Sequence, residues 1–258
     1  MIAQSPRRLP EGSVALVTGA SRGIGQAVAC ALAGAGAHCI LMARTVGGLE
    51  RTDDLIAACN GGTGRATLLP MDLVDGSAAD MLGPSIMARF GRLDILVHCA
   101  ATLGVLTPVT HMRPDAWQDC LALNTTAAWR LIRTTAPLLE QAPHGRAVFL
   151  SDPHARIPAP FWGMVAASRA AQDALVLTWA NELPAGCALR VNLFDPGVAA
   201  TRMRRQAMPG EDFAPLPRPD QVARQILPLC LPDENRQGQR IVARPIVQPV
   251  RDCLTRNA

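Results

Sequence analysis

The sequence predicts an α/β fold in which helices cover both faces of a parallel sheet. Short apolar runs alternate with longer segments of helical periodicity along the whole chain, which is the pattern of parallel strands joined by crossover helices. The first apolar run is followed at once by a glycine-rich turn and an alanine-rich helical segment. Hydrophobic residues make up 49% of the 258 residues, enough for a sheet that is buried on both faces.

The predicted elements follow one another without an internal repeat or a linker, so we expect a single domain over residues 1–258. The expected strands are residues 14–17, 38–43, 65–70, 93–99, 146–151, 188–194 and 238–242. The expected helices are residues 26–35, 47–59, 77–90, 114–139, 161–183 and 221–230.

Proline and glycine set the limits of these segments. Residues 60–64 contain three glycines and end the second helix. Pro114 suits the first turn of the long helix that follows the fourth strand, and Pro137 is expected in its last turn. Pro184 and Gly186 end the next helix.

Three segments fall outside this alternation. Residues 1–12 are expected to be a loose tail, and residues 243–258 an irregular one. Residues 198–219 are rich in Pro, Arg and Met, and we interpret them as a lid over a substrate pocket.

Composition argues against several classes of protein. The net charge is +4, and basic and acidic residues are interspersed, so nucleic-acid binding is not expected. No apolar run is long enough to span a membrane, and no apolar stretch follows Arg7 and Arg8 as it would in a secretory signal. The eight cysteines form no C-x-x-C pair and the five histidines are not clustered with them, so we expect reduced cysteines, no metal site and a cytoplasmic location.

The glycine-rich turn carries the strongest chemical signal. Gly19, Gly23 and Gly25 lie between the first strand and the first helix. Glycine lets the backbone approach a pyrophosphate closely, and a helix N-terminus presents free N–H groups to an anion. The order of strand, glycine turn and helix therefore predicts a dinucleotide site.

The spacing of the turn, Thr18-Gly19-Ala20-Ser21-Arg22-Gly23-Ile24-Gly25, resembles the fingerprint of the short-chain dehydrogenase/reductase family. The segments Gly91-Arg92-Leu93-Asp94 and Trp117-Gln118-Asp119 are similar to bacterial members of the classical type, and the likeness extends from Ser13 to about Val242. It implies a Rossmann-like, doubly wound, seven-stranded parallel sheet that binds NAD(P)(H) at the carboxyl ends of its strands.

The resemblance also implies the cofactor residues. They are Gly19, Ser21, Arg22, Gly23, Ile24, Gly25, Arg44, Asp72, Leu73, Cys99, Ala100, Ala101, Arg169, Pro196, Gly197 and Thr201. Members that prefer NAD place an acid where this chain has Ala43, whereas Arg44 and Arg22 suit the 2′-phosphate of NADP. We therefore expect NADP(H) rather than NAD(H). His98-Cys99-Ala100-Ala101 replaces the Asn-Asn-Ala-Gly of the family and keeps only its alanine.

The catalytic tetrad that the resemblance implies is largely substituted. Its Asn, Ser, Tyr and Lys fall on Asn124, Asp152, Val165 and Arg169. The chain contains no tyrosine, and all 25 of its basic residues are arginine. A shift of one residue would place Ser151 at the serine position, although neighbours on a strand face opposite ways.

Three functions remain open. The first is an NADP(H)-binding protein without the standard carbonyl-reductase chemistry, such as a sensor or a non-catalytic subunit. The second is a working NADP-dependent oxidoreductase that acts on an activated substrate or uses another proton donor, for which Asp152 and His154 are the candidates. The third is an interaction module without cofactor.

Family members usually assemble through their two long helices, here about 114–139 and 161–183. Ala166, Ala167, Ala170 and Ala171 on the second would allow close packing, so we expect a homodimer or homotetramer. The sequence of the expected lid, residues 198–219, does not indicate which small molecule would be the substrate.

Overall fold

Seven parallel strands form the central sheet of the computed structural model, which describes residues 8–59 and 66–245. Along the sheet the strands follow the order β3-β2-β1-β4-β5-β6-β7. They are β1 Val14–Thr18, β2 His38–Ala43, β3 Ala66–Pro70, β4 Ile95–His98, β5 Arg146–Leu150, β6 Arg190–Asp195 and β7 Arg240–Val242. The order reverses between β1 and β4, which is where open parallel sheets bind ligands. The predicted fold class is confirmed.

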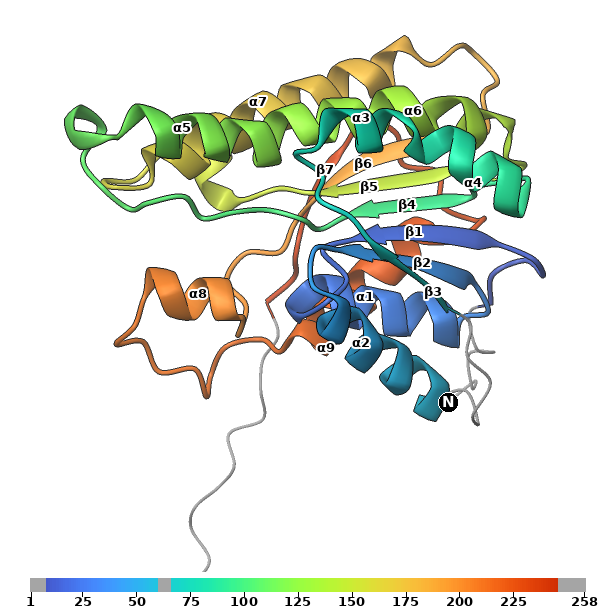
Figure 1. The fold of residues 1–258 in the computed structure, drawn as a ribbon, viewed down its shortest axis with the longest axis horizontal. Helices are drawn as coiled ribbons and strands as arrows, with labels where there is room; N and C mark the ends of the chain where they lie inside the picture. The colour runs from blue at the N-terminus through green and yellow to red at the C-terminus, as the bar shows by residue number, and fades with distance from the viewer. Residues whose placement is uncertain (1–7, 60–65, 246–258) are drawn as a thin grey trace, which may run out of the picture.

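Two layers of helices enclose the sheet (Figure 1). One layer is α1 Gly23–Gly34, α2 Val46–Cys59 and α9 Pro219–Ile226. The other is α3 Gly76–Asp80, α4 Leu82–Phe90, α5 Pro114–Leu121, α6 Ala127–Gln141 and α7 Gly163–Glu182. Each layer buries an apolar face against the sheet, with Leu32 and Ile226 fully buried on one side and Leu131 and Val176 on the other. None of the helices within the described ranges is long and apolar enough to cross a membrane.

Short elements complete the chain. They are the helix α8 Arg202–Ala207, the 3₁₀ turns η1 Val109–His111, η3 Pro153–Ala155 and η4 Leu227–Cys230, and the π-helical turn η2 Ala122–Thr126. Helix α8 lies beyond the carboxyl ends of the strands, where Figure 1 shows it projecting from the body of the molecule. It lies inside the expected lid, and its presence was not predicted.

Three expected helices are interrupted. The helix expected over 77–90 is two helices, because Pro84 lacks an N–H and its ring excludes the carbonyl of Asp80 from a continuous helix. The helix expected over 114–139 contains the π-helical turn η2 and runs on to Gln141. Pro137 therefore lies inside α6 rather than at its end, since buried Leu138 and Leu139 hold the last turn against the core. The last helix tightens to 3₁₀ geometry at Pro228, which again lacks the N–H.

The remaining limits differ from the prediction by a few residues. The first helix begins at Gly23 rather than at residue 26. Residues 1–12 are not a loose tail throughout, because Leu9 is buried and its N–H donates to the carbonyl of Ala35. The glycine-rich break at 60–64, the start of the third strand at residue 65, residues 1–7 and most of the C-terminal tail lie outside the described residues.

Candidate functional site

The glycine turn forms a cradle of bare backbone at the carboxyl end of β1. Gly19 has φ +66°, and a Cβ there would lie 2.9 Å from the amide nitrogen of Ala100. A Cβ on Gly25 would lie 2.3 Å from the carbonyl oxygen of Gly19. The turn therefore packs against α1 and the end of β4 only because these positions are glycine. A cradle that a single Cβ would fill fits a pyrophosphate-binding turn.

Helix α1 begins in this cradle and presents its N-terminus there. Its N-cap is Arg22, no side chain bonds the free N–H groups of its first turn, and that turn contains no acidic residue. The positive end of the helix dipole is therefore not neutralised from within the described chain, which suits an anionic group. Ser21 and Ile24 are half-buried in the same turn.

Two exposed arginines flank the cradle. Arg22 is an exposed residue within the turn, and Arg44 follows β2, where the side chain of Arg44 is 67% exposed. Arg44 lies 4.0 Å from the carboxylate of Asp72, which is itself 47% exposed. Such an open pair contributes little to stability, so Arg44 is available to another anion. Leu73, beside Asp72, is buried.

The end of β4 forms the opposite wall. The hydroxyl oxygen of Thr18 accepts the backbone N–H groups of Cys99 and Ala100, each at 3.2 Å. Cys99, Ala100 and Ala101 are half-buried small residues, so their backbone passes close to the glycine turn. Burial raises the pKa of the Cys99 thiol, which keeps it protonated.

His98 fills the first position of the substituted family motif and is fully buried. Because Thr18 already accepts two N–H groups, its own hydroxyl donates to Nδ1 of His98 at 2.8 Å, so the ring proton lies on Nε2. That Nε2 has no hydrogen-bond partner among the described residues. Burial, with the charge of Arg169, lowers the pKa of His98 to about 3. The ring is therefore a neutral, buried side chain that packs in the core, and it does not act as a proton donor.

The turn after β6 brings the lid towards the cradle. Gly197 has φ +61° and its N–H donates to Asp195, while Pro196 is half-buried. Thr201 caps α8 through the N–H of Arg204, and its methyl group lies 3.7 Å from the Cβ position of Gly23. The structure thus brings Thr201 to the glycine turn, while Pro196 and Gly197 lie in the loop that follows β6.

Asn124 lies in the π-helical turn η2 and is fully buried. Its Oδ1 accepts the N–H of Thr102 at 2.9 Å, and its Nδ2 donates to the carbonyl of Thr102 and to Oγ of Ser168, both at 3.0 Å. Turns of this kind occur frequently at functional sites. Here Asn124 ties the loop after β4 to α7.

Val165 and Arg169, the residues expected at the tyrosine and lysine positions, are both buried. Val165 is 4% exposed and carries no proton to exchange. Arg169 is 5% exposed, and its Nη1 donates to the carbonyl of Leu150 and to Oε1 of Gln172. Burial lowers the pKa of Arg169, against the opposing charges of Asp152 and Asp173. Arg169 therefore supplies positive charge below the site, while its head is held by β5 and α7.

Ser151 does not face the site. Its hydroxyl donates to Oδ2 of buried Asp173 at 2.5 Å, and the same oxygen is paired with Arg240 of β7. Arg240 also contacts Asp195 at 3.0 Å and donates to the backbone carbonyl of Asp152 at 2.7 Å. Ser151 therefore does not take the serine position of the tetrad. It belongs instead to the hydrogen-bonded and ionic network of Asp173 and Arg240.

Asp152 points instead into the loop that follows β5. Its Oδ1 lies 2.8 Å from the backbone nitrogen of His154 and 2.7 Å from Nδ1 of the same residue. The His154 ring stacks on Trp162, with centroids 3.9 Å apart and planes at 7°. No ion pair joins Asp152 to Arg169 in the described structure.

Four residues that contribute to this region were not foreseen. Trp162 lies three residues before Val165 in the sequence. This spacing is nearly one helical turn, so the sequence could have placed Trp162 close to Val165. Arg240 and Asp173 are distant in sequence and meet only through the packing of β7 against α7, so no local pattern marks them. Arg204, within the lid, forms a bidentate pair with Glu211, which raises its pKa together with the charge of Asp152.

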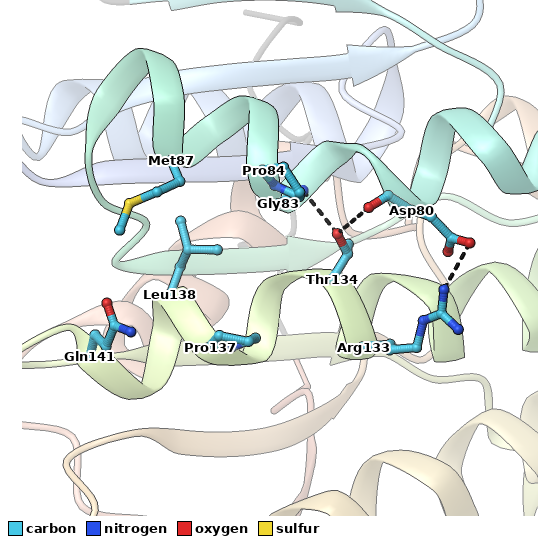
Figure 2. Close-up of a pocket in the computed structure, with 9 residues that line it drawn as sticks. All are labelled: Asp80, Gly83, Pro84, Met87, Arg133, Thr134, Pro137, Leu138 and Gln141. Atoms are coloured by element: carbon cyan, nitrogen blue, oxygen red, sulfur yellow. Dashed lines mark hydrogen bonds and ion pairs between the residues drawn. The ribbon is translucent and has the colours of Figure 1, made fainter.

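A hollow in the described structure lies apart from the cradle. It has a volume of about 380 Å³ and lies between α4 and α6 (Figure 2). Thr134 and Arg133 of α6 face Asp80, and Met87 and Leu138 form the apolar part. None of the expected site residues lines it, so it is separate from the cradle.

The fold and the glycine cradle define a dinucleotide-binding α/β protein of the oxidoreductase type. The short chain dehydrogenase family model matches residues 13–212, and the chain belongs to this family. It is 32% identical to the uncharacterized oxidoreductase YciK of Escherichia coli K12 over 250 residues, which cover 95% of this chain and 97% of YciK.

Two solved structures are similar over nearly the whole chain. A short chain dehydrogenase of Shigella flexneri 2a, complexed with NADP, superposes with a TM-score of 0.85 at 32% identity and covers 92% of this chain and 99% of its own. A short chain dehydrogenase of Escherichia coli CFT073, complexed with NADPH, superposes with a TM-score of 0.86 at 31% identity. The match covers 94% of this chain and 100% of that chain.

Proposed function

We propose that this chain is an NADP(H)-binding oxidoreductase of the short-chain family that does not use the family's Ser-Tyr-Lys proton relay. The observation that carries the cofactor assignment is the bare-backbone cradle at the N-terminus of α1, flanked by exposed Arg22 and Arg44. Two cations beside one phosphate favour NADP(H), because Ala43 offers no carboxylate to a ribose 2′-hydroxyl. The NADP and NADPH in the similar structures support this choice.

The loss of the tyrosine relay rests on composition and burial together. A chain without tyrosine or lysine contains neither the proton donor nor the cation of the tetrad. Val165 and Arg169 occupy those positions and are 4% and 5% exposed. When bound, the cofactor supplies or accepts a hydride. The residues of the cradle would hold it, and Arg169 would supply positive charge at the end of β5.

A thermal unfolding titration with NADPH and NADH tests the cofactor assignment. A ligand that binds only the folded state at a hundred times its Kd adds about 2.7 kcal/mol to the free energy of unfolding. We expect NADPH to stabilise the protein more than NADH does. The double variant Arg22→Gln/Arg44→Gln should lose this preference, whereas Arg89→Gln, an exposed arginine near the amino ends of the strands, should keep it. Equal or absent stabilisation by both nucleotides would refute the assignment.

We expect the loops before α5 and α7 to form the substrate entrance, and their exposed apolar side chains support an apolar small molecule as the substrate. Val109, Ile157 and Phe161 expose 72%, 76% and 56% of their surface on the loops that precede α5 and α7. The N–H of Thr107 donates to the carbonyl of Phe161, which brings these two loops together. Phe161 has φ +74°, a conformation that costs energy in a residue other than glycine. An aromatic or aliphatic carbonyl compound fits this rim better than a sugar.

A further inference from the structure

Asp152 and His154 form a hydrogen-bonded carboxylate–imidazole pair. An ionised carboxylate only accepts hydrogen bonds, so at 2.7 Å from Oδ1 the Nδ1 atom carries a proton. The backbone N–H of His154 donates to the same oxygen at 2.8 Å, which fixes the carboxylate relative to the ring. Nε2 of His154 is thereby left to exchange a proton with another group.

Two neighbours hold this pair in place. Trp162 is buried and stacks flat on the imidazole at 3.9 Å, so the ring has one face covered. Arg240 donates to the backbone carbonyl of Asp152 at 2.7 Å and is anchored by Asp195. The pair therefore rests on a rigid base, although its side chains are 27% (Asp152) and 19% (His154) exposed.

The pair lies beside the helix that carries Val165 and Arg169, the residues expected at the tyrosine and lysine positions. Asp152 stands at the serine position, and η3 packs against α7, which carries Val165. The other candidate donors are engaged or neutral, since Ser151 is bonded to Asp173 and His98 is buried with its Nδ1 on Thr18. Among the described residues next to these engaged groups, His154 presents a partly exposed imidazole, a side chain that can both donate and accept a proton.

We propose that His154, oriented by Asp152 and Trp162, is the catalytic proton donor and acceptor of this site in place of the missing tyrosine. The proposal rests on the NADP(H) function proposed above. In the reductive direction a substrate carbonyl carbon accepts the hydride that the reduced nicotinamide supplies, and the π electron pair moves to the oxygen. That oxygen takes the Nε2 proton of the His154 imidazolium, and the neutral ring regains a proton from solvent. Asp152 and Trp162 are positioning residues.

The charges that face the pair come from four elements. The Asp152 carboxylate at the start of η3 stabilises the imidazolium. Arg240 of β7, Arg169 of α7 and Arg204 of α8 oppose it, the last weakened by its pair with Glu211. Removal of the Asp152 charge should therefore favour the neutral imidazole and allow its other tautomer.

The ring itself can be observed without turnover. Nitrogen-15 NMR of the five histidines, with His154→Gln to assign the signal, should show that neutral His154 carries its proton on Nδ1. In Asp152→Asn the tautomer with the proton on Nε2 should gain population. A wild-type ring protonated on Nε2, or a tautomer population unchanged in Asp152→Asn, would overturn the proposal.

Turnover then tests the role. The probe is NADPH with phenanthrenequinone, an apolar, electron-poor dicarbonyl that matches the entrance. We expect His154→Gln to lower kcat by about 10²- to 10⁴-fold, the usual contribution of a general acid, and to remove the pH dependence of kcat. Imidazole in the buffer should restore part of the rate. His144→Gln, at an exposed position near the amino end of β5, should behave as wild type.

The outcomes separate this proposal from the one on which it rests. Stabilisation by NADPH together with no wild-type turnover, or with a kcat unchanged in His154→Gln, overturns the role of His154 and leaves the cofactor assignment intact. Absence of stabilisation by NADPH refutes the cofactor assignment itself.

Discussion

His98 shows how one substitution alters the chemistry of a buried position. An imidazole between Thr18 and Phe149 can stay in the core only as a neutral ring, since charging it would leave a cation without water. Its pKa of about 3 in the folded protein therefore lies well below the ordinary value of 6.5.

This difference in pKa makes stability depend on pH. Between about pH 6.5 and 3 the unfolded chain binds a proton at His98 that the folded chain does not, so stability falls as the pH falls. We expect His98 to contribute at most about 1.4 kcal/mol per pH unit in this window. Urea unfolding from pH 7 to 4 should give a flatter profile for His98→Asn than for wild type. Comparing these two proteins cancels the opposing effect of Asp173, whose pKa burial raises. Parallel profiles would contradict the prediction.

Two glycines of α1, Gly25 and Gly34, differ in the space around them, so replacing each with alanine should have opposite effects. A Cβ on Gly25 meets the carbonyl oxygen of Gly19 at 2.3 Å, whereas one on Gly34 meets nothing within 4 Å. Gly25→Ala should therefore open the cradle, lower the melting temperature and abolish stabilisation by NADPH. Gly34→Ala should retain binding and gain up to about 1 kcal/mol from helix propensity. Calorimetry with and without NADPH measures both, and intact binding in Gly25→Ala would show that the cradle tolerates a Cβ.

At the scale of elements, the π-helical turn between α5 and α6 positions Asn124 between the loop after β4 and helix α7. Its amide satisfies both backbone groups of Thr102 and the hydroxyl of Ser168, so three segments meet at one side chain. Among the described residues, the hydrogen bonds of Asn124 to Thr102 are the side-chain bonds that join the loop after β4 to η2. The turn is thus a joint between the cradle wall and the substrate side.

Replacing Asn124 with alanine should loosen this joint. Each buried polar group left without a partner costs about 1–3 kcal/mol, so we expect a loss of at least that size in the free energy of unfolding. Hydrogen exchange should also become faster at the amide of Thr102. Thr126→Ala, at an exposed position of the same turn, is the matched control and should change neither measurement. Equal stability of the two variants would show that Asn124 is not an anchor.

At the scale of the whole molecule, the helices α6 and α7 present a surface suited to a second copy of the chain. Ala167 and Ala170 of α7 are exposed, and Trp129 of α6 exposes 41% of its surface. Ala166 is buried and Ala171 half-buried, so only two of the four expected small residues are free for such a contact. We propose a homodimer or homotetramer through this face.

A large charged side chain in this face should prevent assembly. We expect Ala170→Arg to shift the mass measured by light scattering after gel filtration to that of a monomer. Ala58→Arg, on exposed α2 in the opposite layer, should leave the mass of the assembly unchanged. A monomeric wild-type protein, or an unchanged mass in Ala170→Arg, would exclude this interface.

The sequence by itself determined the sheet, the order of its elements, the glycine cradle and the absence of a tyrosine relay. Hydrophobic periodicity and the conformational limits of glycine act within a few neighbouring residues, and a missing residue type is visible in the sequence itself. The same reasoning failed at Pro84 and Pro137, where one proline divided a helix and the other did not. Burial of Leu138 and Leu139 made the difference.

The tertiary structure alone decided which side chains meet at the site. It turned Ser151 towards Asp173, placed Arg240 beneath Asp152 and stacked His154 on Trp162. These partners are separated by between 8 and 88 positions in the chain. Their meeting depends on strand register and on how loops pack across the sheet edge, because the energies involved come from burial and paired charge rather than from any local preference.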